Sequence, residues 1–306
     1  MDNTALIEEL ARRCTLPAEA LAKLLTTLTE AEAETLYARA RAVREAHYGR
    51  AVYLRGLIEF SNVCRNDCRY CGIRRSNGRL ERYRLTAEQI LACCDRGHAL
   101  GFRTFVLQSG EDAHYTDDAL CDLVARIKHA HPDCAVTLSL GEKAAASYQA
   151  YFDAGADRYL LRQETTDPAL YARWHPEAMR LGHRLRCLET LKRIGYQVGA
   201  GIMVGAPGQT AESVVADLFY MQAHAFEMVG IGPFIPHKDT PFKAAAAGTL
   251  EDTLHLLAVI RLMMPRVLLP ATTALGTIHP LGREKGLLAA DQIGERRVGK
   301  ECRSRW

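Results

Sequence analysis

Short apolar runs alternate with helical segments along most of the chain, and this alternation constrains the fold more than any other feature of the sequence. The runs are rich in branched residues and occupy residues 53–61, 104–111, 135–142, 157–164, 197–205, 228–236 and 266–274. Helix-like segments such as TAEQILACCDRGHALG and TAESVVADLFYMQAHAFE lie between them. Continuous apolar strands joined by helical crossovers favour parallel pairing, and hence the α/β class.

The positions of polar residues distinguish two kinds of parallel sheet. A doubly wound sheet would also satisfy the alternation, but here polar residues follow the C-terminal ends of many different strands. These residues are Gln108, Glu111, Ser139, Arg162, Glu164, Thr272 and Thr273. A site built from many strand ends is typical of a (β/α)8 barrel, whose chemistry lies at that one rim. We therefore predict a TIM-type (β/α)8 barrel.

The sequence divides into three predicted segments. Residues 1–50 are dense in Ala, Leu, Glu and Arg with helical spacing, which predicts an N-terminal helical cap. Residues 51–290 hold seven barrel strands, and we expect the barrel to be truncated before its eighth strand. Residues 291–306 resemble the translation of a sequencing adapter, so we expect a foreign, unstructured tail. A barrel open at this point would be poorly stable or inactive.

Charge and hydropathy exclude several classes of partner. The net charge of +3 arises entirely from residues 295–306, which carry five Arg or Lys and two Glu, while the remaining chain holds 34 charges of each sign. We therefore expect no nucleic-acid partner. No apolar run is long enough to span a membrane, and the acidic N-terminal start is unlike a signal peptide. These features predict a cytoplasmic protein, in which ten cysteines are thiols or metal ligands.

Three cysteines, Cys64, Cys68 and Cys71, directly follow the first strand on a loop of the predicted rim. A structural zinc site needs four ligands, usually as two close pairs, and the nearest further thiols, Cys93 and Cys94, fall on the next helix. Three unrelated buried thiols are the other simple interpretation. An iron–sulfur cube can take three protein thiolates and leave one iron open for an exogenous ligand. We therefore predict that the three cysteines hold an iron–sulfur cluster.

The CxxxCxxC spacing, with Tyr70 just before the last cysteine, resembles the radical S-adenosylmethionine superfamily, in which S-adenosylmethionine chelates the open iron. Further words between residues 50 and 290 are similar to the [FeFe]-hydrogenase maturases of that superfamily: IEFSNVCRNDCRYCGIRRSN, ERYRL, VLQSGED, VTLSLGE, GADRYLLR, VGAGIMVGAPGQT, MVGIGPFIPHKDTP and PATTALGTI. The resemblance implies a [4Fe-4S] cluster and S-adenosyl-L-methionine as cofactors, and their use to generate a 5'-deoxyadenosyl radical. It also implies a small iron complex carrying cysteine, carbon monoxide and cyanide as substrate, a low-potential electron donor, and other hydrogenase maturases as partners.

The same resemblance assigns individual residues to ligands. It places the following at S-adenosylmethionine: Tyr70, Gln108, Glu111, Glu164 and Arg184. We add Thr137 and Ser139 to this set, because they alternate in the third strand and so point the same way, into the barrel or towards its rim. The resemblance places the following at the substrate: Arg162, Thr272 and Thr273. A carboxylate suits an ammonium group, and a guanidinium suits the methionyl carboxylate. Taken alone, these residues could instead form a Gly turn with exposed acids, buried barrel hydroxyls, a buried ion pair and strand-stabilising threonines.

Two other functions stay open at this point. A radical enzyme acting on a carbon substrate, of the methylornithine synthase or biotin synthase type, would share most of these features. Cys134 and Cys187 do not obviously supply the auxiliary cluster that a biotin synthase needs. A non-catalytic iron–sulfur scaffold would bind the cluster for delivery. His237, Asp239 and His279 are polar residues of rim loops to which we assign no role.

Overall fold

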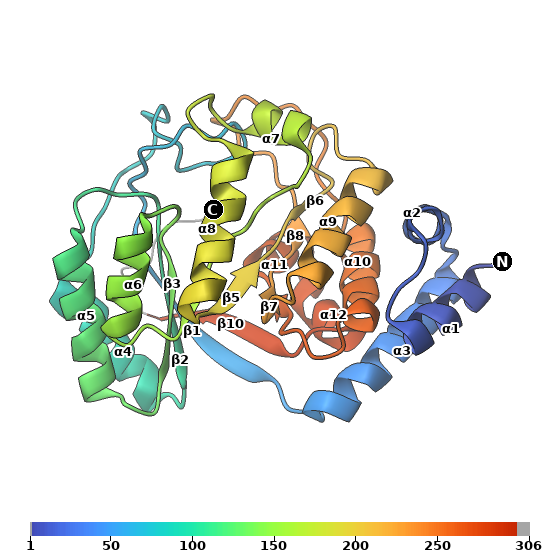
Figure 1. The fold of residues 1–306 in the computed structure, drawn as a ribbon, viewed down its shortest axis with the longest axis horizontal. Coiled ribbons are helices and arrows are strands. Elements are labelled where there is room, and N and C mark those ends of the chain that lie inside the picture. Colours follow the sequence, from blue (N-terminus) through green and yellow to red (C-terminus); the bar gives the residue numbers. More distant parts are fainter. Residues whose placement is uncertain (1, 299–306) are drawn as a thin grey trace.

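A closed ring of parallel strands forms the centre of the molecule (Figure 1). The computed structural model describes residues 2–298. The sheet contains, in spatial order, β7 (Met228–Val229), β5 (Gln197–Ala200), β4 (Arg158–Leu160), β3 (Ala135–Ser139), β2 (Thr104–Ser109), β1 (Tyr53–Ser61), β10 (Ile293–Arg297) and β9 (Pro270–Ala271). The ring closes where Met228 bridges Leu268, and the Val229 N–H donates to the Leu268 carbonyl over 3.0 Å. The predicted (β/α)8 barrel is confirmed, and each of its seven predicted strands is present.

The eighth strand of the barrel is β10, so the expected truncation before that strand is wrong. β10 pairs in parallel with β1 on one side and with β9 on the other. The expectation of an unstructured tail is also wrong for residues 291–298, of which Asp291, Ile293 and Val298 are buried; the remainder of that tail lies outside the described residues. The physical reason is that the open edges of β1 and β9 pair with backbone groups, whatever side chains the incoming segment carries. A charged segment therefore completes the ring without an apolar pattern.

Helices cover the outside of the barrel and run back from the rim to the start of the next strand. They are α4 (Ala87–Ala99), α5 (Asp117–Ala130), α6 (Ala145–Asp153), α8 (Leu181–Ile194), α9 (Ala211–Ala223), α10 (Leu250–Met263) and α12 (Gly282–Ala289). Four of them begin at a threonine whose side chain accepts a hydrogen bond from a backbone N–H of the first turn: Thr86, Thr116, Thr210 and Thr249. These caps fix where each rim loop ends and its helix begins.

Three N-terminal helices pack on one side of the barrel, at the right of Figure 1. They are α1 (Asn3–Arg13), α2 (Ala18–Thr27) and α3 (Glu30–Tyr48). α2 lies on α9, while α3 lies on α10 and α12. Their buried residues, including Leu10, Leu21 and Leu36, belong to the same hydrophobic core as the barrel. The Arg44 guanidinium also donates to the Leu287 carbonyl over 2.7 Å, so these helices support the segment leading into β10.

Short elements build up the rim above the strand ends. β6 (Met203–Val204) pairs in parallel with β8 (Gly232–Pro233), and α7 (Pro168–Trp174) and α11 (Thr273–Ile278) follow β4 and β9. A second, smaller core of Leu170, Trp174, Met203, Ala206 and Phe234 joins α7 to β6 and β8. This core holds α7 against the rim loops, where the predicted site residues lie.

Candidate metal centre and cofactor pocket

The three cysteines lie on residues 62–84, the long loop that joins β1 to α4 at the rim. Cys64, Cys68 and Cys71 are free, partly buried thiols. The end of β2 lies directly against this loop: a Cβ added to Gly110 would come within 2.3 Å of the Val63 carbonyl oxygen and 2.7 Å of the Cys64 Cβ. Glycine at this position therefore allows β2 to approach the first cysteine.

One arginine organises the loop around the cysteines. The Arg82 guanidinium donates to the backbone carbonyls of Asn62, Ile73, Arg74 and Asn77 over 2.5–3.3 Å. Each of its two terminal NH2 groups therefore donates to two carbonyls. Much of the basic character of this segment serves to hold the loop together rather than to bind an external anion.

Replacing Arg82 with methionine should loosen the loop without unfolding the barrel. Four carbonyls would lose their donor, but these hydrogen bonds are only partly buried, so water can take its place and each costs less than the about 1–3 kcal/mol of a fully buried unsatisfied group. We expect iron bound per chain after reconstitution to fall at least twofold, and proteolysis within residues 62–84 to speed up. Arg75→Met is the matched control, because this exposed arginine lies on the same loop. Equal iron content in both variants would contradict the role of Arg82.

The three thiols fit a multi-iron cluster better than a single metal ion. The loop offers three free thiols, Cys64, Cys68 and Cys71, which is one ligand fewer than a structural zinc ion takes. Burial raises the pKa of the Cys64 and Cys68 thiols and raises that of Cys71 to about 12. Thiolates at these positions therefore require a bound cationic metal group, whose binding would release protons.

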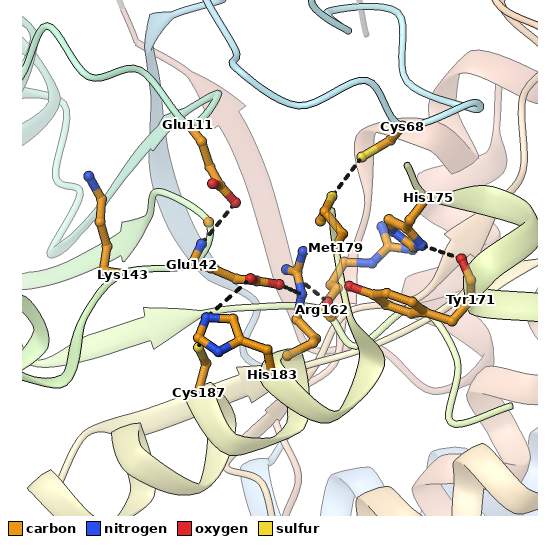
Figure 2. Close-up of polar contacts among 12 residues, drawn as sticks. Cys68, Glu111, Glu142, Lys143, Arg162, Tyr171, His175, Met179, His183 and Cys187 are labelled. Carbon is orange, nitrogen blue, oxygen red and sulfur yellow. Dashed lines mark hydrogen bonds and ion pairs between the residues drawn. The ribbon is translucent and has the colours of Figure 1, made fainter. Parts of the chain in front are cut away.

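A segment after β4 covers the cysteine loop (Figure 2). The Arg69 N–H donates to the Trp174 carbonyl over 2.8 Å, and the Met179 sulfur lies 3.7 Å from the Cys68 Sγ. The His175 Nδ1 lies 2.9 Å from the Tyr171 carbonyl, which only accepts, so Nδ1 carries the proton. Its Nε2 then accepts from the Tyr70 hydroxyl over 3.2 Å. Sequence reasoning singled out Tyr70 but missed His175 and Met179, which no recognised motif marks.

Acid should weaken this contact through His175. Burial lowers the pKa of His175 to about 4, and the Arg184 charge adds to the effect. Between pH 6.5 and 4 the unfolded chain therefore binds a proton that the folded chain does not, so stability falls as the pH falls. At about 1.4 kcal/mol per pKa unit, the loss is about 3 kcal/mol. Denaturant unfolding from pH 7.5 to 4 should show a shallower decline for His175→Gln; an unchanged decline would contradict the assignment.

Glu111 lies over Gly141, at the end of the neighbouring strand β3. A Cβ on Gly141 would meet the Glu111 side chain at 2.3 Å, and Gly141 has a φ of 75° that favours glycine. One Glu111 oxygen accepts from the Glu142 N–H over 3.0 Å, and the other accepts from the Arg65 guanidinium over 3.0 Å. Arg65 is exposed, so an ammonium group could take its place beside the carboxylate.

Glu142 is a functional candidate that sequence reasoning missed. Its carboxylate lies 2.7 Å from Arg184 Nε and 3.5 Å from His183 Nε2, and both partners come from the first turn of α8. Figure 2 shows Glu142 facing His183. Burial alone would lower the pKa of Arg184, but Tyr171 and Glu142 raise it, so the guanidinium stays charged. The segment LGE, which directly follows β3, places an acid at the rim. Only the fold shows that this acid, Glu142, faces α8.

Arg162 and Glu164 form an ion pair of 2.9 Å just beyond β4. Glu164 has a φ of 66°, which an ordinary L-residue rarely adopts, and its N–H donates to the Gly201 carbonyl. Such backbone strain is found most often at functional sites. The Arg162 Nε and the Thr137 hydroxyl are buried and have no hydrogen-bond partner in the described chain. Both atoms are suited to bind a polar ligand in the mouth of the barrel.

The remaining predicted residues lie on both sides of the barrel mouth. Gln108 of β2 and Ser139 of β3 are direct neighbours in the sheet. Thr272 follows β9 as the N-cap of α11 and donates from its hydroxyl to the Ile231 carbonyl over 3.2 Å, while Thr273 begins α11. Among the described residues, no hydrogen bond or ion pair connects these two threonines to the cysteine loop. They therefore form a separate part of the rim.

Across residues 2–298, none of the helices is both long and apolar enough to cross a membrane.

Comparisons with known proteins agree with this geometry. Residues 58–221 match the family model of the Radical SAM superfamily. The chain is 50% identical over 233 residues to the [FeFe] hydrogenase maturase subunit HydE of Thermotoga maritima, covering 76% of this chain and 66% of that protein. It is 31% identical to the 3-methylornithine synthase of Methanosarcina acetivorans, covering 75% and 66%. The crystal structure of methylornithine synthase (PylB) matches with a TM-score of 0.88 and 27% identity, over 98% of this chain and 88% of the other. The chain thus spans just under two thirds of the length of both curated relatives.

Proposed function

This chain belongs to the Radical SAM superfamily, and from this premise we propose that it is a radical enzyme of [FeFe]-hydrogenase maturation. The observation that carries the proposal is the set of three free, partly buried thiols, Cys64, Cys68 and Cys71, on the first rim loop. The 50% identity to a HydE maturase subunit supports this branch of the superfamily.

We propose that Cys64, Cys68 and Cys71 hold a [4Fe-4S] cluster whose remaining iron binds S-adenosylmethionine. When bound, this pair supplies one-electron cleavage of the sulfonium to methionine and a 5'-deoxyadenosyl radical. Arg184 would bind the methionyl carboxylate, and Glu111 would accept from the amino group. Tyr70, Gln108, Thr137, Ser139 and Glu164 would line the rest of that pocket, with Glu164 at the adenosine. The barrel walls and α7 would keep water away from the reacting bond.

The substrate we propose is a small iron complex carrying cysteine, carbon monoxide and cyanide. Arg162 would bind its anionic part, and Thr272 and Thr273 would cradle it from the other side of the barrel mouth. The partners that we propose for the protein are other hydrogenase maturases and a low-potential electron donor. Nine cysteines of the described chain are free thiols, which fits a reducing compartment, and we propose the cytoplasm.

Anaerobic reconstitution tests the proposal. The reconstituted protein is reduced with dithionite, supplied with S-adenosylmethionine and analysed for 5'-deoxyadenosine by chromatography. We expect product only with iron and sulfide loaded, and faster formation when the iron complex is added. An intact, reduced cluster that yields no 5'-deoxyadenosine would favour a non-catalytic scaffold.

A second candidate is a radical enzyme acting on a carbon substrate, of the methylornithine synthase type. The observation in its favour is the TM-score of 0.88 over 98% of this chain. The same assay separates the two candidates, because an amino-acid substrate would replace the iron complex as the compound that accelerates 5'-deoxyadenosine formation.

A further inference from the structure

Positive charge is concentrated on the cysteine loop, whereas the charges of the rest of the chain nearly balance. Residues 62–84 contain seven arginines and two acids. The rest of the chain carries 32 basic and 34 acidic residues, and five of those basic residues lie in residues 295–306. The loop is therefore strongly basic in a chain that is otherwise close to neutral, and such an asymmetry steers an acidic partner towards one face.

Part of this charge serves the fold and part of it faces solvent. The Arg82 guanidinium donates to loop carbonyls, and Arg84 forms an ion pair with Asp112. Arg74 forms an ion pair with Asp67 over 2.7 Å. Arg69 and Arg75 are exposed, and no carboxylate pairs with either of them within residues 2–298. Arg69 is one residue from Cys68, so free positive charge lies directly beside a predicted cluster ligand.

A second segment adds charge next to the loop. Residues 237–243, which follow β8, carry the exposed Lys238 and Lys243. They join the loop along an open cavity of about 440 Å³, lined by Arg74, Asn77, Arg79, Lys238, Asp239 and Lys243. Asp239 pairs with Arg79 over 3.0 Å and fixes the two segments together. His237, to which the sequence assigned no role, packs on Gly72 directly after Cys71.

We propose that this basic face, formed by residues 62–84 and 237–243, docks an acidic one-electron carrier protein. The proposal rests on the proposed function, because one electron must pass from the reduced carrier to the cluster, and no bond forms or breaks in that step. The cations are spread over two exposed segments, which suits the broad face of a protein better than one small anion.

The same face is poorly suited to nucleic acid. Single strands bind through exposed aromatic rings as well as through positive charge. The two aromatic side chains of the loop are turned inward: Tyr70 contacts His175, and the Tyr83 hydroxyl donates to the Glu59 carbonyl over 2.8 Å.

Four charge-removing substitutions test the docking face. The variant R69Q/R75Q/K238Q/K243Q removes four exposed cations of this face that no carboxylate of residues 2–298 pairs with, and R50Q/R96Q/R193Q/R266Q removes four exposed arginines at the opposite end of the barrel. The probe is a plant-type [2Fe–2S] ferredoxin, which is acidic and of low potential. Its binding is followed by fluorescence anisotropy with oxidised ferredoxin, and cluster reduction by stopped-flow with reduced ferredoxin.

We expect the docking-face variant to raise the Kd and lower the reduction rate at least tenfold at low salt. The difference should shrink as salt is raised, and the control variant should match the unmodified protein. Equal effects of both variants, or none, would overturn the proposal. Binding of a labelled RNA oligonucleotide can be measured by anisotropy in the same way. The proposal would also be overturned if the docking-face variant lost RNA binding while its ferredoxin binding was unchanged. Reduction by dithionite should be the same in all three proteins, so failure to form 5'-deoxyadenosine with dithionite would count against the proposed function and not against the docking face.

Discussion

Replacing Cys68 with serine should abolish stable iron–sulfur loading and, with it, formation of 5'-deoxyadenosine. A serine hydroxyl does not ionise near neutral pH and is a poor ligand for iron, which prefers thiolate sulfur in such clusters. Even the loss of a residue that only supports a metal ligand typically costs 10–100-fold in affinity, so the loss of a ligand should cost more. Iron and sulfide analysis, together with the visible absorbance of the cluster, measures the result. Cys64→Ser and Cys71→Ser should behave in the same way.

Cys94→Ala is the matched control. This thiol is fully buried on α4, in the hydrophobic core and away from the rim. We expect a packing loss in the range of about 1–2 kcal/mol, with iron content unchanged. If Cys94→Ala also lost its iron while remaining folded, the three-thiol site would be wrong, and a site that shares ligands with α4 would have to replace it.

The strands and the cysteine loop could be predicted because both leave local signals. Continuous apolar runs mark strands that are buried on both faces of a barrel, and three cysteines within eight residues mark their own site. The barrel also explains why polar residues after different strands come together, since the ends of all parallel strands meet at one rim. This is how Tyr70 and Arg184, far apart in sequence, come close enough to interact electrostatically.

What could not be predicted depends on contacts without a local pattern. β10 forms because its backbone pairs with the open edges of β1 and β9, which does not depend on its side chains. The charged residues that follow Ile293 therefore do not predict a strand. His175 and Met179 reach the cysteine loop only because the smaller core places α7 over the rim. Glu142 looked like one more acid at a strand end, and its pairing with Arg184 depends on where α8 starts relative to β3.

Replacing Glu142 with glutamine should cost both stability and affinity for S-adenosylmethionine. Glutamine keeps the shape but leaves the buried Arg184 guanidinium without its counter-charge, and breaking a buried ion pair in this way costs about 3–5 kcal/mol. Denaturant unfolding measures this loss. The double variant Glu142→Gln with Arg184→Gln should recover part of it, because neither buried charge then remains. Glu227→Gln, which breaks the half-exposed pair with Lys192, is the control and should cost at most about 1 kcal/mol.

The ligand series separates a positioning role from a purely structural one. If Glu142 holds Arg184 in place for the methionyl carboxylate, Glu142→Gln should weaken S-adenosylmethionine binding by about 10–100-fold, the range seen when a supporting residue is lost. Binding of 5'-methylthioadenosine, which lacks the amino-acid part, should stay within about twofold, because no charge-assisted contact to Arg184 is involved. Calorimetric titration of both ligands against the folded variant measures the difference. Equal weakening of the two ligands would show that Glu142 supports the pocket as a whole and does not position Arg184.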